Sequence, residues 1–298
     1  MTKKIIIFAP NLSKGGGRTL ISSIINQLPK RIKKTIHFYL DMRLLNEFGQ
    51  KNLYATFINP SVYSRLLAEL KLCLLSRSNT KLVLMLGSLG PLLRLNCKTI
   101  VFVQNKFLIT NITLSKFNLK TKFRIIIERL WLRYSAKNID IFVVQTESMK
   151  NILRTSPISQ SKKIEIIPFL EKIKTTKLAT KKQNNFVYIA SGDPHKNHFN
   201  LIKAWEILAI DDIYPELYVT LDSKTNNKIL NMINICNEKF NTKIINLGEV
   251  SRTEVFKLYE RSHALIYPSK FESFGLPLLR ANQLEIPILA SELGFLRD

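Results

Sequence analysis

Short apolar runs alternate with longer amphipathic stretches along nearly the whole chain. Residues 4–10 are apolar after the first position and end at a proline, which predicts a fully buried strand. A loop over 11–17 and an amphipathic helix over 18–27 are predicted next. In the rest of the first half, the pattern predicts strands at 35–41, 54–59, 81–87, 99–104, 139–145 and 163–169, and helices at 61–76, 117–137 and 147–154.

The alternation resumes after a Lys/Thr-rich segment, residues 171–185, which lacks periodicity and predicts a linker. Beyond it, strands are predicted at 186–190, 217–222, 243–248, 264–268 and 287–291, and helices at 198–209, 226–240, 253–261 and 276–285. Strand, helix, strand in this rhythm indicates parallel sheets covered by helices, because a parallel pair needs a crossover connection. We therefore predict an α/β protein with two Rossmann-like domains, residues 1–170 and 182–298, that face each other across a cleft.

Composition narrows the class of protein further. A chain of 298 residues with 46% hydrophobic and 22% charged residues is globular and long enough for two domains. Cys73, Cys97 and Cys236 lie far apart and match no metal or disulfide spacing, which indicates reduced thiols in a cytoplasmic protein. The first apolar run is too short for a signal peptide, and no apolar stretch approaches the roughly 18 residues of a membrane span.

The charge balance favours anionic partners. The chain has 45 Lys and Arg residues and 22 Asp and Glu residues, which leave a net charge of +23. Such a field attracts nucleic acid, acidic phospholipid or phosphorylated small molecules, although a composition bias would also produce a basic surface. No RNA- or DNA-binding module is recognisable in the sequence, which disfavours the first of these partners.

Candidate binding residues follow the strands, because ligands of open α/β sheets bind beyond the carboxyl ends of the strands. After the first strand, Gly15, Gly16 and Gly17 lead into a helix, where the backbone can approach a phosphate or a sugar hydroxyl. A plain flexible turn is the alternative. The segment is neither a P-loop nor a dinucleotide fingerprint with its acidic partner, which disfavours a Rossmann dehydrogenase.

The second half places a lysine and a carboxylate after two of its strands. Lys196, near a helix start, can neutralise a diphosphate. His195 and His198 have no acidic or Cys companion, so no metal site is predicted. Glu272 precedes a helix that starts near Gly275, so it can accept hydrogen bonds from hydroxyls beside free amides that hold phosphate. This pairing suits a nucleotide-activated sugar; the alternative is a charge that favours the helix dipole.

The stretch 267–281 resembles the donor-site signature of GT-B glycosyltransferases of family 4, retaining enzymes that use nucleotide-diphosphate sugars. The positions in register are Pro268, Ser269, residues 272–277, Ala281, residues 287–291, the turn 194–197 followed by 201–204, and the glycines at 15–17. The matching positions and residues 101–105 together make the chain similar to bacterial enzymes that assemble O-antigen or capsule polysaccharide. The resemblance covers both halves and is most specific over 186–298.

The resemblance implies a role for each matching residue. Lys196 and Glu272 would be the catalytic residues, on the donor diphosphate and on the sugar hydroxyls. The donor-binding residues would be Gly16, Gly17, Asn197, Ser273, Phe274, Gly275, Leu276 and Arg280, and the acceptor-side residues Gln104 and Asn105. No metal and no cofactor is expected beyond the nucleotide sugar. The leaving diphosphate would help to deprotonate a lipid-linked glycan acceptor, at the inner face of the plasma membrane.

The chain departs from the family pattern in four ways. Arg280 stands where the family has a second glutamate, Ser191 where it has a basic residue, and Gln104 and Asn105 where it often has a histidine. The sequence also stops soon after the donor motif, so we expect a second domain that is incomplete at its C-terminus, with lower solubility and activity. A truncated or degenerate member that acts as a non-catalytic binding or scaffold protein is the alternative function.

The helix predicted over 117–137 carries a broad apolar face. Its members are Phe123, Ile126, Ile127, Leu130, Trp131 and Tyr134, and the cations around them are Lys122, Arg124, Arg129, Arg133 and Lys137. We expect this face to cover the sheet as part of the core. The alternative is contact with an anionic bilayer that holds the acceptor.

Overall fold

The computed structural model describes residues 4–78, 80–115, 117–159, 162–168, 184–292 and 294. The chain divides into two compact units, Met1–Glu171 and Lys172–Arg297, and each is described by itself below. The predicted linker lies outside the described residues except for its last two positions, and so do residues 295–298.

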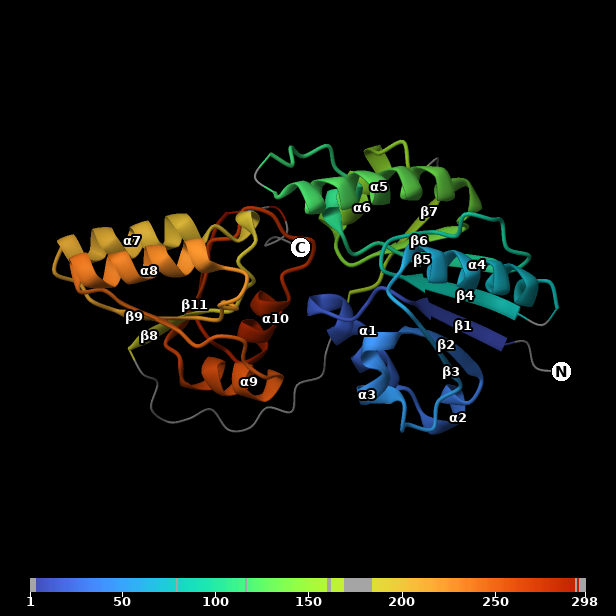
Figure 1. Cartoon of the computed structure of the whole chain (residues 1–298), viewed down its shortest axis with the longest axis horizontal. Coiled ribbons are helices and arrows are strands. Elements are labelled where there is room, and N and C mark those ends of the chain that lie inside the picture. Colours follow the sequence, from blue (N-terminus) through green and yellow to red (C-terminus); the bar gives the residue numbers. More distant parts are fainter. Residues whose placement is uncertain are drawn as a thin grey trace. The chain divides into compact units, whose positions relative to one another are not determined.

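Unit 1 is built on a seven-stranded parallel sheet with the order β3-β2-β1-β4-β5-β6-β7 (Figure 1). Its strands are β1 Lys4–Ala9, β2 Ile36–Asp41, β3 Ala55–Ile58, β4 Thr80–Leu86, β5 Lys98–Phe102, β6 Ile141–Val144 and β7 Lys163–Ile166. The order of connections reverses at β1, which pairs with β2 on one side and with β4 on the other. The loops that follow β1, β4 and β5 therefore lie together at the carboxyl edge of the sheet, where such folds bind ligands.

The helices of unit 1 cover both faces of this sheet. They are α1 Gly15–Gln27, α2 Lys30–Lys33, α3 Leu45–Phe48, α4 Val62–Ser76, α5 Leu119–Ser135 and α6 Glu147–Thr155, with short 3-10 turns η1 Met42–Leu44, η2 Lys106–Leu108 and η3 Ala136–Asn138. Right-handed crossovers place α4, α5 and α6 on one face and α1 on the other. Ser61, Asn118 and Thr146 cap α4, α5 and α6, each by accepting a hydrogen bond from a backbone N–H of the first turn.

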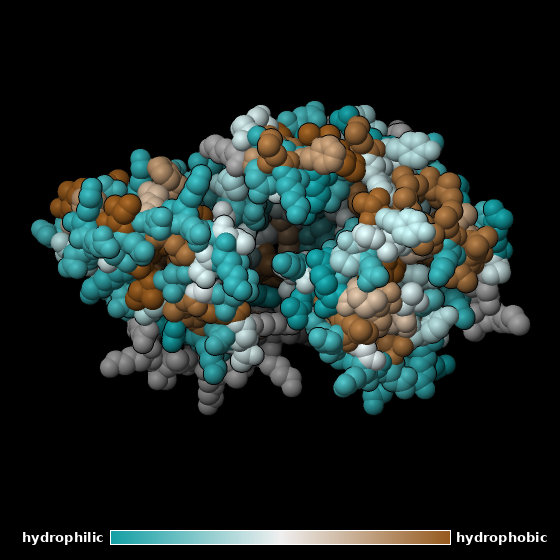
Figure 2. Space-filling view, in the orientation of Figure 1, coloured by the Kyte–Doolittle hydropathy of each residue, from teal (hydrophilic) through white to brown (hydrophobic). Residues whose placement is uncertain are grey.

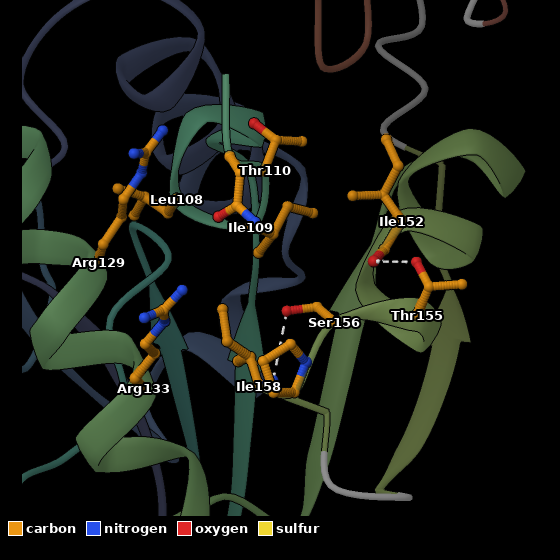
Figure 3. A pocket seen from close by; sticks show the side chains of 11 residues that line it. Leu108, Ile109, Thr110, Arg129, Arg133, Ile152, Thr155, Ser156 and Ile158 are labelled. Atoms are coloured by element: carbon orange, nitrogen blue, oxygen red, sulfur yellow. Dashed lines mark hydrogen bonds between the residues drawn. The ribbon is translucent and has the colours of Figure 1, made fainter. Parts of the chain in front are cut away.

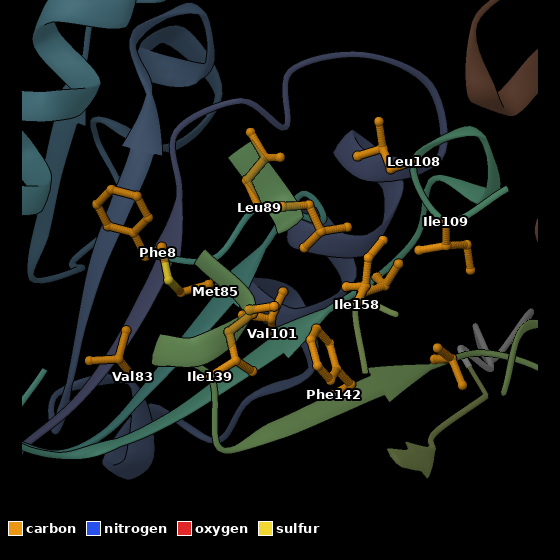
Figure 4. Close-up of a cluster of buried hydrophobic side chains, with 14 of the residues drawn as sticks. Phe8, Val83, Met85, Leu89, Val101, Leu108, Ile109, Ile139, Phe142 and Ile158 are labelled. Carbon is orange, nitrogen blue, oxygen red and sulfur yellow. The ribbon is translucent and has the colours of Figure 1, made fainter. Parts of the chain in front are cut away.

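The core of unit 1 lies between the central strands and the helices packed on them. Phe8, Val83, Met85, Val101 and Phe142 are fully buried (Figure 4). They come from four adjacent strands, β1, β4, β5 and β6, so the nearly continuous apolar runs in the sequence are explained by a sheet that is covered on both sides.

Unit 2 contains a five-stranded parallel sheet with the order β10-β9-β8-β11-β12. Its elements are β8 Asn185–Tyr188, η4 Pro194–Lys196, α7 His198–Ile210, β9 Glu216–Val219, α8 Asn227–Phe240, β10 Lys243–Asn246, α9 Arg252–Arg261, β11 Ala264–Tyr267, α10 Leu276–Gln283 and β12 Ile288–Ala290. Ser251 and Glu254 form a reciprocal capping box at the start of α9. The predicted α/β class with two parallel sheets is confirmed.

Two local predictions are wrong. The helix predicted over 18–27 begins earlier, at Gly15, so the three glycines form its first turn instead of a loop. The Arg18 N–H closes that turn by donating to the Lys14 carbonyl at 3.3 Å. Gly17 also packs closely on Leu12, since a Cβ at position 17 would lie 2.7 Å from Leu12 Cδ2. A glycine-rich start is tolerated here because tertiary contact compensates for its low helix propensity.

The second wrong prediction concerns α5, whose broad apolar face does not cover the sheet. Its exposed residues are Leu119, Phe123, Ile126, Ile127, Leu130 and Tyr134, and Phe123 retains 67% of its accessible surface. The buried residues of the helix are Ile125, Leu132 and Ser135 on the other side, while Trp131 is half-buried. The helix is therefore apolar on two faces, and only the narrower one contacts the core. None of the helices in the described ranges is long and apolar enough to cross a membrane.

Candidate functional site

Two loops of unit 2 meet at the carboxyl ends of the neighbouring strands β8 and β11. We name them the Lys196 loop (residues 189–197) and the Glu272 loop (residues 268–275). Lys196 Nζ lies 2.5 Å from Glu272 Oε1, and the two side chains are only 15% and 11% exposed. The strand order of unit 2 reverses at this point, so this pair occupies the position where an open α/β sheet binds its ligand.

Hydrogen bonds between the two loops hold the pair in place. Ser269 Oγ donates to Glu272 Oε1 at 2.6 Å, so the same oxygen accepts from a hydroxyl and from the ammonium group. Asn197 Nδ2 donates to the Pro268 carbonyl at 3.1 Å. The Lys270 N–H donates to the His195 carbonyl at 2.8 Å. These hydrogen bonds fix the geometry of the site.

Two buried tyrosines form the floor beneath the pair. The rings of Tyr188 and Tyr267 meet edge to face, 5.8 Å between centroids, and Lys196 Nζ lies 5.9 Å above the Tyr267 ring. The Tyr188 hydroxyl donates to the Lys196 carbonyl at 2.7 Å. Burial, together with the charge of Glu272, raises the pKa of both phenols, so both stay neutral and act as an apolar, positioning surface.

The Glu272 loop ends in a helix start with free donors. Gly275 has φ of 75°, a left-handed conformation that favours glycine, and Pro277 occupies the first turn of α10. The amides of Leu278 and Leu279 donate to the Gly275 carbonyl. Among the described residues, the N–H groups of Phe274, Gly275 and Leu276 have no acceptor. Free amides at a helix N-terminus attract an anionic group.

Arg280 lies one turn further along α10 and packs against α9. Its guanidinium carbon is 5.5 Å from the centre of the Phe256 ring. Burial lowers the pKa of Arg280, while the nearby Tyr259 acts in the opposite direction. Ser273 is half-buried beside Glu272. The predicted donor roles of Arg280 and Ser273 stay predictions.

In unit 1, the predicted residues follow β1 and β5, the two neighbours of β4 in the sheet. Gly16 and Gly17 lie in the first turn of α1, after β1. Gln104 and Asn105 follow β5, and their amides donate to Ser88 Oγ at 2.9 Å and 3.0 Å. Asn105 Oδ1 accepts from Phe107 N–H at 3.0 Å, so its amide nitrogen is the part that can contact a ligand.

Two residues at this edge were missed by the sequence analysis. Ser88 has φ of 71°, and it ties the end of β4 to the loop after β5. Asp41 ends β2, is fully buried, and accepts from Arg43 Nε at 2.8 Å. Burial alone would raise the pKa of Asp41, but hydrogen bonds from Arg43 and Ser13 and the charge of Arg43 lower it. A Gly-Ser pair after an apolar run, and an aspartate that ends one, are the signals that could have identified them.

The histidines near Lys196 are neutral. Burial, and then the positive charge of Lys196, lower the pKa of His195 and bring that of His198 to about 4. In the described part of the chain, no group of three or more His, Cys, Asp or Glu residues could hold a metal ion.

Sequence comparison with known proteins matches part of the chain. Residues 170–298 match the family described as "Glycosyl transferases group 1". O-antigen chain mannosyltransferase RfbU of Salmonella typhimurium is 26% identical over 172 residues, which cover 55% of this chain and 46% of that protein. O-antigen chain mannosyltransferase B of Escherichia coli is 25% identical over 193 residues, which cover 56% of this chain and 49% of that protein. The aligned part thus spans about half the length of these relatives.

The fold comparison covers nearly the whole chain. The crystal structure of HepE from Anabaena in complex with UDP and glucose aligns with a TM-score of 0.64, over 99% of this chain and 82% of that chain. The two sequences are 12% identical, so this likeness shows the fold alone. That fold is GT-B, with two parallel α/β sheets.

Proposed function

We propose that this chain transfers a sugar from a nucleotide-diphosphate sugar to a glycan acceptor, because residues 170–298 match the family described as "Glycosyl transferases group 1". The observation that carries the proposal is the Lys196–Glu272 pair beside the free amides of Phe274–Leu276. A cation and amides suit a diphosphate, and a carboxylate suits sugar hydroxyls. The two relatives named as O-antigen mannosyltransferases favour a surface polysaccharide, built on a lipid carrier, as the acceptor.

The reaction exchanges one bond at the anomeric carbon for another. The bond from that carbon to the diphosphate oxygen breaks, and its electron pair leaves with the diphosphate. A new bond forms to the acceptor hydroxyl oxygen, whose proton passes to the leaving diphosphate, with the configuration at the anomeric carbon retained. Lys196 and the helix amides stabilise the charge that develops on the diphosphate, as a divalent cation does in other enzymes. Glu272 holds the sugar hydroxyls while the bond breaks.

Both relatives are named as transferases, and nothing in the site favours the non-catalytic alternative. The Lys196–Glu272 ion pair indicates how the donor enters. The diphosphate replaces Glu272 as the partner of Lys196, and the sugar hydroxyls replace Lys196 as the partner of Glu272. Each group exchanges one charged or polar partner for another, so neither is left buried and unpaired at the end.

A screen of nucleotide sugars by thermal shift tests the donor site. We expect one of the UDP-, GDP-, ADP- and dTDP-linked sugars to raise the unfolding temperature, because ligand at 100 times its dissociation constant adds about 2.7 kcal/mol of stability. Lys196→Ala should abolish the shift, and Lys270→Ala, which removes an exposed cation from the neighbouring loop, should keep it. A shift that survives Lys196→Ala, or no shift with any of the four classes, would contradict the proposal.

A second part of the proposal is that unit 1 rests on an anionic bilayer at the inner face of the plasma membrane. The helices α4 and α5 lie side by side, since the Arg65 guanidinium of α4 is 5.0 Å from the ring of Trp131 in α5. Hydrophobic side chains gather over both helices in Figure 2. The exposed apolar residues of α4 are Val62, Tyr63, Leu67, Leu70, Leu74 and Leu75, and they adjoin the exposed face of α5.

The charges on these two helices match an anionic surface. Each helix has a single carboxylate, Glu69 in α4 and Glu128 in α5. Glu69 is buried and paired with Arg65 at 3.1 Å, and Glu128 is half-buried, so neither carboxylate lies openly on the surface. Cations surround the exposed apolar residues of the two helices, namely Lys71 of α4 and Lys120, Lys122, Arg124, Arg129 and Arg133 of α5. Apolar residues with surrounding cations and no exposed carboxylate favour an anionic bilayer as the partner.

Vesicle flotation tests this contact. We expect the protein to float with vesicles that contain 30% phosphatidylglycerol and to stay in solution with pure phosphatidylcholine. Phe123→Ser combined with Leu130→Ser should lower the bound fraction at least tenfold, because each removes an exposed apolar side chain. Ile210→Ser, at an exposed apolar position of unit 2, is the matched control. Binding that depends on neither lipid charge nor the α5 residues, or self-association through this face, would contradict the proposal.

A further inference from the structure

A cavity of about 210 Å³ lies in unit 1 between α5, the segment after η2 and the end of α6 (Figure 3). Pockets for drug-sized ligands usually measure about 300–1,000 Å³. The cavity is therefore too small for a nucleotide sugar, and its size suits a single compact group. All of its lining residues belong to unit 1.

Two arginines of α5 line one side of the cavity. Arg129 Nε donates to the Phe107 carbonyl at 2.8 Å and Nη2 donates to the Ile112 carbonyl at 3.3 Å. These bonds fix the guanidinium and leave three of its five N–H groups for a ligand. Arg133 lies one turn further along the helix and is exposed. In the part of the chain that the structure describes, no carboxylate pairs with either arginine, and none lines the cavity.

The two positive charges repel each other in the absence of an anion. Like charges four residues apart on a helix destabilise it. Burial, and then the charge of Arg133, lower the pKa of Arg129. The carboxylate of Glu128 does not offset this repulsion, because its electrostatic partners are Arg124 and Arg65. An anion bound between the two guanidinium groups would relieve the repulsion, and paired guanidiniums suit phosphate oxygens because of their planar forks of donors.

The opposite side of the cavity supplies hydroxyl and apolar groups. Figure 3 shows Ser156 and Thr155, at the end of α6, across the cavity from the two arginines. Ser156 Oγ accepts from Ile158 N–H at 3.3 Å, so its own hydrogen remains to be donated. Thr155 Oγ1 donates to the Ile152 carbonyl at 3.1 Å. Ile109 and Ile158 make the inner wall apolar, which strengthens a charge-assisted hydrogen bond to the ligand.

The position of the cavity along α5 favours a membrane lipid as the source of the phosphate. Leu130 lies between Arg129 and Arg133 in the sequence and belongs to the exposed apolar stripe, as does Ile126 one turn earlier. We propose that this cavity binds the phosphate group of an anionic membrane lipid, whose hydrocarbon chains contact the exposed stripe of α5. This inference rests on the bilayer contact proposed above and adds recognition of one chemical group to it.

The test compares two anionic vesicles of equal surface charge, one containing phosphatidylglycerol and one containing oleate, which has no phosphate. Arg133→Gln should lower binding about fiftyfold on phosphatidylglycerol and only about fivefold on oleate. The smaller factor is the general effect of one cation near an anionic surface, and the remainder is the loss of charge-assisted hydrogen bonds. Lys120→Gln removes an exposed cation from the start of the same helix, and should lower binding about fivefold on both vesicles.

Each outcome decides a separate question. Equal losses for Arg133→Gln on both vesicles would overturn phosphate recognition while the bilayer contact stands. No binding of wild-type protein to either vesicle would overturn the bilayer contact and this inference with it, without affecting the donor site. A titration of inorganic phosphate into lipid-free protein separates a free anion from a lipid. Arg133-dependent phosphate binding together with equal losses on both vesicles would assign the cavity to a free phosphate instead. Unchanged circular dichroism and unfolding temperature of Arg133→Gln exclude misfolding.

Discussion

Replacing Lys196 or Glu272 with alanine is expected to lower the rate of sugar transfer by about 10² to 10³-fold, the usual effect of removing one group that stabilises transition-state charge. The two variants should have different effects on KM, because the two residues form an ion pair with each other. Lys196→Ala removes the cation for the diphosphate, so KM for the donor should rise as kcat falls. Glu272→Ala releases Lys196 from its partner, so KM should hold or fall while kcat drops.

Initial rates over a range of donor concentrations measure both parameters. Lys270→Ala and Glu285→Ala, which remove exposed charges of the same signs from unit 2, are the matched controls and should transfer at the wild-type rate. The double variant Lys196→Ala, Glu272→Ala should be little slower than the slower single variant, because residues that act as a unit are not additive. Wild-type turnover by either single variant would show that the pair is structural.

Acidification from pH 7 to pH 5 is expected to cost unit 2 about 2 kcal/mol of folding free energy through His198 alone. The side chain is 3% exposed, and its two ring nitrogens have no hydrogen-bond partner among the described residues. Its pKa is lowered from 6.5 to about 4 by burial and then by the charge of Lys196. Asp193 acts in the opposite direction, and His195 in the same direction as Lys196.

The sign of this pH dependence follows from which state, folded or unfolded, holds the proton on His198. Between pH 6.5 and about pH 4 the unfolded chain holds the proton on residue 198 and the folded protein does not. Stability therefore rises with pH across this window, by at most about 1.4 kcal/mol per unit, and the contribution is lost as the pH falls. His37 in unit 1, with its pKa also lowered to about 4 by burial and by Lys4, acts in the same direction on the other unit.

Urea unfolding at pH 7 and pH 5 measures the effect. Trp205 lies on α7 with His198, and the chain's other tryptophan is Trp131, so fluorescence in a Trp131→Phe background reports on unit 2. His198→Phe keeps an aromatic ring against Tyr188, whose centroid is 4.8 Å from that of the imidazole, and removes the titration. The variant should lose about 2 kcal/mol less than the parent over this pH range. Equal losses in the two proteins would assign the pH dependence to other groups.

The helices, the strands and the donor-site residues could be predicted from the sequence because their signals are local. A strand buried on both faces needs a continuous apolar run, so residues 4–10 predicted β1 directly. The capping residues Ser61 and Ser251 act on amides within the next few positions, and the helices predicted over 61–76 and 253–261 are observed as α4 and α9. Lys196 and Glu272 each follow a strand, and neighbouring parallel strands bring their carboxyl ends to one edge. The sequence thus predicted that the two would lie close together.

Tertiary structure alone decided which surfaces are covered. Periodicity predicts α5 correctly, but it cannot say which of its two apolar faces meets the core, because that depends on where the sheet and α4 lie. The start of α1 at Gly15 depends on the contact between Gly17 and Leu12. The roles of Ser88 and Asp41 depend on partners supplied by other segments or by a local turn. The cavity with Arg129 and Arg133 joins three segments that are separate in the sequence. Helix caps, strands and loop residues depend on neighbouring residues in the sequence. Burial and the pairing of charges depend on contacts between segments that only the folded chain brings together.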